Sequence, residues 1–126
     1  MLPQRYRLKK NADFRKIYKQ GRSIADSYLV LYFWPRAKKH FFSNPRIGFS
    51  VSRRLGSAIQ RNKIKRKMRA ALRPYLPLIR QDVDLIFIAR LKIKGIPFQN
   101  VEKSIESLLK KAGLIGQREK QGSDLQ

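Results

Sequence analysis

The sequence contains no cysteine and one histidine, His40, and these scarcities exclude several kinds of active site. Without cysteine the chain has no disulfide, no thiolate zinc site and no cysteine nucleophile. A single histidine supplies neither a histidine-rich metal site nor a histidine pair. No apolar run approaches the roughly 18 to 20 residues that span a bilayer, and the basic segment 1–10 lacks the apolar stretch of a secretory signal. We therefore expect a cytoplasmic protein without a membrane segment.

Acidic residues are scarce as well, and their distribution is uneven. The chain has 8 Asp and Glu against 30 Lys and Arg, a net charge of +22. No acid occurs from Ser27 to Gln81, a window with 14 Lys or Arg. Because folded surfaces normally intersperse both signs, this window indicates one continuous positive surface for a polyanion. The alternative is that these cations only solvate helix faces. Apolar residues make up 42%, enough for a globular core.

The residue pattern offers little catalytic chemistry. Asp82 and Asp84 are spaced so that both lie on one face of a strand, where they could bind a metal ion. Such a pair more often marks the polar start of a strand, and we favour that interpretation. His40, beside Lys38 and Lys39, is interpreted as a surface residue, and no glycine-rich phosphate loop is present. We therefore expect no catalytic residue and no metal site in this chain.

Periodicity and turn signals predict one small α/β sandwich of a single sheet with packed helices. Asn11 is expected to cap the first helix and Gly21 to end it. Whether Asp26-Ser27 breaks the first strand region into two strands stays open. The expected helices are 12–20, 57–73 and 97–112, and the expected strands are 23–34, 46–53 and 82–90. The last strand carries a nearly continuous apolar run, which is typical of a central strand covered on both faces.

The helix over 57–73 has two contrasting faces. An apolar arc is formed by Ile64, Met68, Ala71 and Leu72, and a polar arc by Asn62, Arg66, Arg69 and Arg73. Nine Lys or Arg lie between Arg53 and Arg73. Such a density of cations can neutralise several phosphates along a groove, and arginine can clamp a phosphate with two hydrogen bonds.

Aromatic residues form a second constellation. Phe14 and Tyr18 share a helical face, and Tyr28, Tyr32 and Trp34 share a strand face. Bases of a single nucleic-acid strand stack on such platforms. Large aromatic rings are more often simply part of the core, and composition alone favours that interpretation. In the strand expected over 46–53, the face formed by Gly48, Ser50 and Ser52 has small side chains, so that another group can approach its backbone.

One long motif allows a family resemblance to be stated. Residues 46–69 read RIGFSVSRRLGSAIQRNKIKRKMR. This segment closely resembles the signature of the bacterial ribonuclease P protein family: a strand ending in Gly-x-Ser-Val, a Gly-x-Ala turn, and Arg-Asn-x-x-Lys-Arg-x-x-Arg on a helix. The resemblance extends to residues 7–10, 13–14, 18, 21–22, 84–90 and the closing helix. Two positions differ from the usual pattern, since the family often has Phe at Tyr18 and Glu or Gln at Ala70.

The resemblance implies a fold and a function. The implied fold is an α/β (α+β) two-layer sandwich of order α-β-β-β-α-β-α, with a four-stranded sheet and a left-handed βαβ crossover. Residues 1–113 would form one RNA-binding domain, and 114–126 a polar, disordered tail. The implied function is that of the protein subunit of an RNA-based endonuclease that removes the 5′ leader from precursor tRNA. The catalytic RNA subunit would hold the Mg²⁺ ions, and no further protein partner is required.

The resemblance also implies which residues bind RNA. Phe14, Tyr18 and Tyr32 would line a central cleft for the 5′ leader. The RNA subunit would contact Arg53, Arg54, Arg61, Asn62, Lys65, Arg66 and Arg69. Two other functions fit parts of the pattern. A ribosomal protein that binds rRNA would share the charge and the size, and a stand-alone nuclease would use Asp82 and Asp84 to hold its metal ion.

Overall fold

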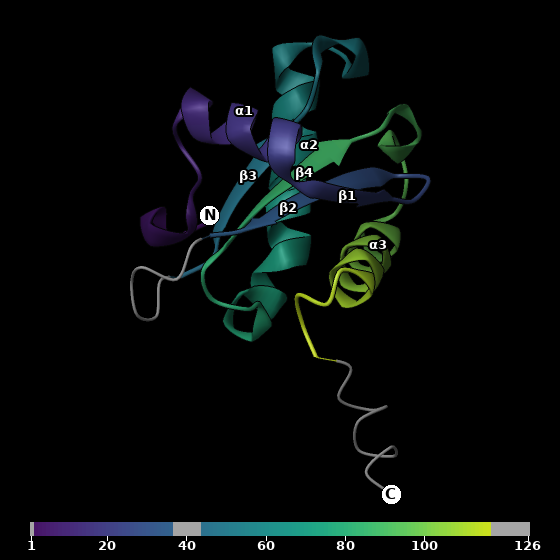
Figure 1. The fold of residues 1–126 in the computed structure, drawn as a ribbon. Coiled ribbons are helices and arrows are strands. Elements are labelled where there is room, and N and C mark those ends of the chain that lie inside the picture. The colour runs from purple at the N-terminus through teal and green to yellow at the C-terminus, as the bar shows by residue number, and fades with distance from the viewer. Residues whose placement is uncertain (1, 37–43, 117–126) are drawn as a thin grey trace, which may run out of the picture.

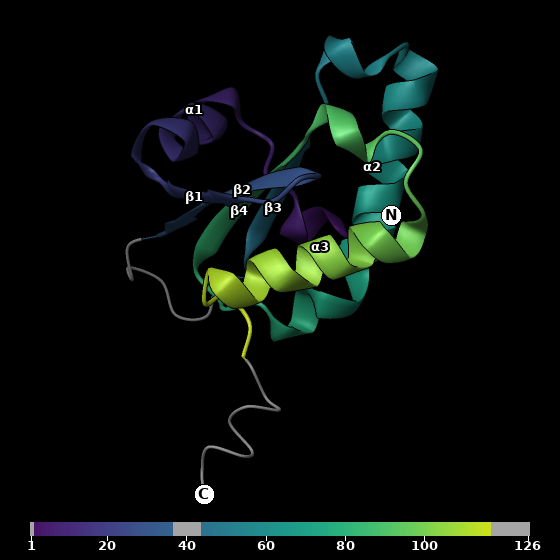
Figure 2. The same ribbon diagram turned by 90° about the vertical axis from the view of Figure 1, so that its right-hand side faces the viewer.

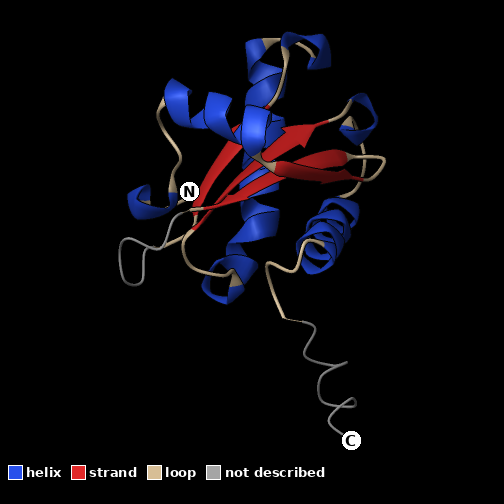
Figure 3. Ribbon diagram, viewed as in Figure 1, coloured by secondary structure: helices blue, strands red, loops and turns tan. Residues whose placement is uncertain are grey.

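Helices and strands follow one another along the chain in the order α-β-β-β-α-β-α that the resemblance implies (Figures 1 and 3). The computed structural model describes residues 2–36 and 44–116. In these residues the helices are α1 (Asn11–Gln20), α2 (Ala58–Leu72) and α3 (Phe98–Lys111), and the strands are β1 (Arg22–Ala25), β2 (Leu29–Pro35), β3 (Arg46–Ser50) and β4 (Val83–Ala89). Short 3-10 turns join several of them.

The four strands form one mixed sheet in the order β1-β2-β4-β3. Strand β2 runs antiparallel to β1 and β4, while β3 runs parallel to β4. The central position of β4 confirms the expectation from its apolar run, since Leu85, Ile86 and Phe87 are fully buried. The chain passes from β3 to its parallel neighbour β4 through α2, and the left hand of this crossover stays a prediction.

Helices cover both faces of the sheet, and the two layers differ in size. Figure 2 shows α1 on one side and α2 and α3 on the other. The larger core joins α2 and α3 to Leu29, Leu31 and Phe33 of β2, among others. The smaller core, under α1, consists of the buried residues Leu8, Ile17 and Ile86. Ile17 is the one buried residue of α1, so apolar packing holds this helix far less firmly than α3.

The first strand region does break at Asp26. One oxygen of the Asp26 carboxylate accepts hydrogen bonds from the backbone N–H groups of Tyr28 and Leu29, both at 2.9 Å. This turn separates β1 from β2, because its carboxylate satisfies backbone groups that would otherwise continue a strand. Tyr28 therefore precedes β2 and packs against the larger core. Its expected place on one strand face with Tyr32 is wrong.

The ends of the helices differ from the sequence expectations at two residues. Asn11 is the first residue of α1 and not its cap, since Lys10 is the N-cap and no side chain bonds there. Gly21 has φ −77° and ends α1 in an extended conformation. A Cβ at Gly21 would lie 2.6 Å from the Ile17 carbonyl oxygen and 2.8 Å from that of Phe33. Glycine is needed there for close packing rather than for a left-handed turn.

The folded part of the chain extends past the expected boundary at residue 113. Leu114 and Ile115 are buried in the larger core, and the backbone N–H of Arg80 donates to the Leu114 carbonyl at 2.8 Å. The expected tail start at 114 is therefore too early. Residues 117–126 and the loop with His40 lie outside the described residues. None of the helices within 2–36 and 44–116 has the length and apolar character of a membrane span.

Candidate RNA-binding site

The start of α2 is built by local sequence. The Ser57 hydroxyl accepts from the Gln60 N–H at 3.2 Å, and the Gln60 side chain accepts from the Ser57 N–H at 2.8 Å. This capping box satisfies backbone groups that a helix start leaves free. Gly56 has φ +130°, and the Gln60 side chain occupies the space where a Cβ would stand. The Gly-Ser-Ala turn therefore sets where the basic helix begins.

The two faces of α2 are as the periodicity predicts. Met68, Ala71 and Leu72 are fully buried against the larger core. On the other side, Asn62 and Arg66 are exposed. The remaining members of the predicted RNA face, namely Arg61, Lys65 and Arg69, are half-buried. Their spacing of i, i+1, i+4, i+5 and i+8 brings all five residues to one side of the helix.

The two remaining predicted cations lie outside α2. Arg53 and Arg54 are exposed in the short 3-10 turn that precedes the helix. Arg54 borders a groove of about 710 Å³ between the β1–β2 turn and the end of β4. Arg54 therefore lines a different groove from Lys65 and Arg69 of α2.

A smaller groove of about 320 Å³ joins α2 to α1. Its walls include Lys65 and Arg69 of α2, Phe14 of α1 and Gly48 of β3. Arg7 and Lys9 of the N-terminal arm also line it, and they are not among the residues that the sequence predicts for the site. A groove with several cations and an aromatic wall has the composition that suits a single nucleic-acid strand.

The three predicted cleft aromatics lie in one row between α1 and the sheet. The Phe14 and Tyr18 ring centroids are 6.4 Å apart, and the Tyr18 and Tyr32 rings meet edge-on at 5.1 Å. Tyr18 is 39% exposed, and Phe14 and Tyr32 are half-buried. None of the three rings is fully buried, although Phe14 and Tyr32 pack against the smaller core. Their partial exposure is what a stacking surface requires, while contact with a leader stays a prediction.

The polar contacts of Tyr18 also tie α1 to β3. Burial raises the pKa of Tyr18 above its ordinary value, the hydrogen bond to Ser50 opposes this, and nearby Tyr32 adds to it. The hydroxyl thus has a partner on the sheet while one side of the ring stays accessible. A tyrosine in such a place combines an apolar ring with a satisfied polar tip.

The other strand aromatic, Trp34, lies on the same face of β2 as Tyr32 and also contacts α1. It packs against the smaller core, and the Lys16 ammonium of α1 lies 5.6 Å from the centroid of its ring. Such a cation–π contact covers the ring from the α1 side. Trp34 therefore serves to seat α1 on the sheet.

The larger groove contains cations that are not among the residues predicted from the sequence. Arg90 and Lys92 follow β4 directly and line this groove together with Arg54. Ile88 borders it and, like Tyr32, packs against the smaller core. The sequence does contain a signal for these two residues. Arg90 and Lys92 come just after the central strand, and therefore lie at the same end of the sheet as the small residues of the parallel strand β3.

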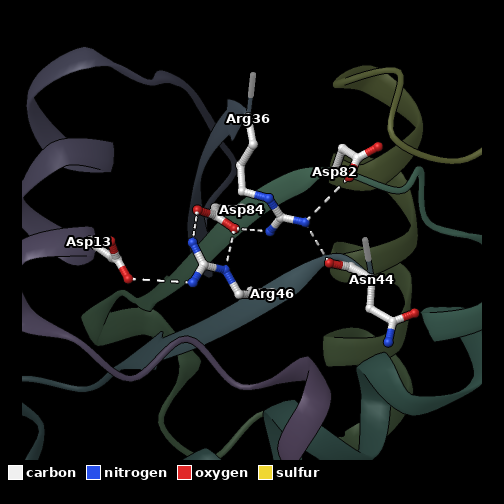
Figure 4. A network of polar contacts seen from close by, with 6 residues as sticks. All are labelled: Asp13, Arg36, Asn44, Arg46, Asp82 and Asp84. Atoms are coloured by element: carbon white, nitrogen blue, oxygen red, sulfur yellow. Dashed lines mark hydrogen bonds and ion pairs between the residues drawn. The ribbon is translucent and has the colours of Figure 1, made fainter. Parts of the chain in front are cut away.

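The two acids that could have held a metal ion take part in an ion network instead (Figure 4). One oxygen of Asp84 accepts from Arg46 Nε at 3.0 Å and the other accepts from Arg46 Nη2 at 2.8 Å. Arg36 donates to Asp84 as well and pairs with Asp82 at 3.8 Å. The hydrogen bond to Asp84 raises the pKa of Arg46, against the effect of burial. Both oxygens of Asp84 are therefore held by guanidinium groups.

Comparison with known proteins agrees with this architecture. The family model described as Ribonuclease P matches residues 2–113. The ribonuclease P protein component of Streptococcus agalactiae is 40% identical over 110 residues, which cover 87% of this chain and 96% of the relative. That of Clostridioides difficile is 39% identical over 108 residues, covering 85% and 91%.

Solved structures of the same family share the fold. The ribonuclease P protein of Staphylococcus aureus has a TM-score of 0.77 and 40% identity, over 88% of this chain and 98% of that chain. The protein from Thermotoga maritima has a TM-score of 0.73 and 31% identity, over 83% and 96%. The matches span nearly all of the described fold, including the α2 motif and the aromatic row. The chain thus belongs to the ribonuclease P protein family, has an RNA partner and takes part in tRNA processing.

Proposed function

We propose that this chain works in the cytoplasm with a catalytic RNA subunit, and that together they remove the 5′ leader from precursor tRNA. The observation that carries the proposal is the aromatic row of α1 and β2, partly exposed and joined by a basic groove to α2. Among the described residues, no group of three His, Asp or Glu lies close enough to hold a metal ion. In this proposal the RNA holds the catalytic Mg²⁺ ions.

The outer side of α2 is proposed to bind the RNA subunit. Each cation that neutralises a phosphate releases condensed counterions, which favours binding. Arginine adds paired hydrogen bonds to phosphate oxygens. Because the opposite side of α2 is the core, RNA binding requires no rearrangement of the helix. The residues assigned to this contact are Arg61, Asn62, Lys65, Arg66 and Arg69 of α2, together with Arg53 and Arg54 of the turn that precedes it.

The aromatic row is proposed to bind the 5′ leader of the substrate. Bases of an unpaired strand would stack on Phe14, Tyr18 and Tyr32, each stacked base contributing about 1–3 kcal/mol. Arg7 and Lys9, on the wall of the same groove as Phe14, would neutralise its phosphates. Stacking is tolerant of sequence, because every base has an aromatic face. The chain would thereby favour precursor over mature tRNA without reading the leader's bases.

The test uses the reconstituted holoenzyme, meaning this chain with its RNA subunit at low Mg²⁺. Tyr32→Ala should weaken binding of precursor tRNA and leave the affinity for mature tRNA, which has no leader, unchanged. Tyr28→Ala is the matched control, because Tyr28 packs against the larger core. It should leave the ratio of the two affinities at the wild-type value. If Tyr32→Ala lowers the affinity for both RNAs equally, the ring has a structural role and does not bind the leader.

A further inference from the structure

The Asp84 ion network reaches from the sheet to α1. Arg46 lies at the start of β3, and Asp84 near the start of the neighbouring strand β4. Beyond its two bonds to Asp84, Arg46 uses its other terminal nitrogen, Nη1, to contact the Asp13 carboxylate of α1 at 3.5 Å. Figure 4 shows Asp13 approaching from α1, on the side of Arg46 away from Arg36.

Arg46 is held more rigidly than its own exposure suggests. Its side chain is 35% exposed, but the Asp84 side chain to which it is bonded is only 5% exposed. A guanidinium bonded by two nitrogens to one carboxylate has a defined orientation. The third nitrogen therefore points to Asp13 from a fixed place on the sheet, and the position of Asp13 is tied to that of β3 and β4.

Helix α1 needs such a contact, because its apolar anchor is small. Ile17 alone among its residues is buried, whereas α3 buries five. Asp13 directly precedes Phe14, whose ring passes so close to β3 that a Cβ at Gly48 would lie 2.4 Å from it. A shift of α1 at Asp13 would therefore move Phe14 over the strand.

We propose that Arg46 is a positioning residue for the aromatic row: it connects buried Asp84 to Asp13 and so sets the place of α1 above the sheet. The inference rests on the proposed function, since it concerns the same leader site. Arg46 acts through Phe14 and Tyr18 and does not itself touch the leader.

Arg36 provides a matched comparison within the same network. It bonds to the same carboxylate of Asp84 but turns toward Asp82 and the Asn44 carbonyl oxygen, at 2.8 Å from the latter. A purely structural role of the network predicts similar effects for both arginines. A positioning role predicts that only the branch through Arg46 and Asp13 affects the leader.

The experiment measures, for reconstituted holoenzymes, the affinities for precursor tRNA, for mature tRNA and for the RNA subunit, with the thermal midpoint of each protein. Asp13→Asn should lower the precursor-to-mature preference by about threefold to fivefold, the size expected for a partly exposed ion pair. Affinities for mature tRNA and for the RNA subunit should not change. Asp13→Glu should retain the preference, because it keeps the carboxylate.

Two further comparisons separate the positioning role from a loss of stability and from the effect of removing an acidic residue in the first turn of α1. In an Arg46→Gln background, Asp13→Asn should cause no additional loss of preference, since its partner is already gone. Arg36→Gln should lower the thermal midpoint and leave the preference at the wild-type value. The inference is overturned if Asp13→Asn keeps the preference, or if Arg36→Gln lowers it as much.

The failure of this inference is distinct from a failure of the proposed function. If Tyr32→Ala lowers the preference and Asp13→Asn does not, the leader site stands and the role of Arg46 is wrong. If Tyr32→Ala leaves the preference intact, the leader site is wrong, and the positioning role falls with it.

Discussion

Adding one methyl group at Gly48 should displace the Phe14 ring from β3. A Cβ there would lie 2.4 Å from Phe14 Cζ and 2.7 Å from Cε2. Carbon atoms in contact are about 3.5–4.0 Å apart, so in Gly48→Ala the ring must move by roughly 1 Å. Overpacking of this kind costs about 1–3 kcal/mol. The smaller entropy of alanine in the unfolded chain offsets about 0.4–1 kcal/mol.

We therefore expect Gly48→Ala to lower the free energy of unfolding by about 1–2 kcal/mol. The larger effect should be on the affinity for precursor tRNA. If the displaced Phe14 ring no longer stacks, leader binding loses about 1–3 kcal/mol, which corresponds to roughly fivefold to 150-fold in the affinity for precursor tRNA. The assay compares precursor and mature tRNA on the reconstituted holoenzyme, and urea denaturation gives the free energy of unfolding.

Removing the ring is the control for this reasoning. In a Phe14→Ala background the nearest remaining atom to the new Cβ is Leu8 Cδ2, at 3.4 Å, which is close to ordinary contact. Gly48→Ala should then cost little further stability and no further leader affinity. The reasoning is refuted if Gly48→Ala destabilises the protein equally with and without Phe14, or if it weakens both tRNAs alike.

Three other outcomes follow from the site. If about five phosphates are contacted, log K for the RNA subunit should fall against log salt with a slope of roughly −3.5 to −4.5, and a slope near zero would rule out phosphate-driven docking. Arg66→Ala should reduce binding to the RNA subunit while shifting the free energy of unfolding by less than about 0.5 kcal/mol. Met68→Ala should lower the free energy of unfolding by about 2–5 kcal/mol. The opposite pattern would mean that the RNA-binding and core faces of α2 are assigned the wrong way round. Because burial raises the pKa of Tyr18, the ultraviolet difference titration between wild type and Tyr18→Phe should show a transition above the ordinary tyrosine range. The stability that neutral Tyr18 contributes should be complete below its unfolded pKa and decline as the pH rises through the raised value. A transition at the ordinary value would contradict the desolvation that raises this pKa.

Features that depend on neighbouring residues were predictable from the sequence. The capping box of Ser57 and Gln60 starts α2 within four residues, and the helical period separates Met68 from Arg66. The apolar run of β4 indicated a central strand for the same reason, since burial on both faces leaves no polar alternation. The motif in residues 46–69 also indicated the protein family, because its residues are close together in the chain.

Features that depend on how α1 sits on the sheet appeared only in the tertiary structure. Phe14 and Tyr32 look like core residues in the sequence, because the period of a helix or strand says which way a ring faces and not how completely it is covered. The contact of Arg46 with Asp13 joins residues 33 positions apart, and its bond to Asp84 spans 38. No local pattern predicts such pairs. Composition and local spacing alone determined that this chain is a basic α/β domain with one amphipathic, cation-rich helix. The tertiary structure decided that Phe14, Tyr18 and Tyr32 stay partly exposed. The reason is that α1 is held on the sheet by one buried residue, Ile17, and by the ion network, and so does not cover these rings completely.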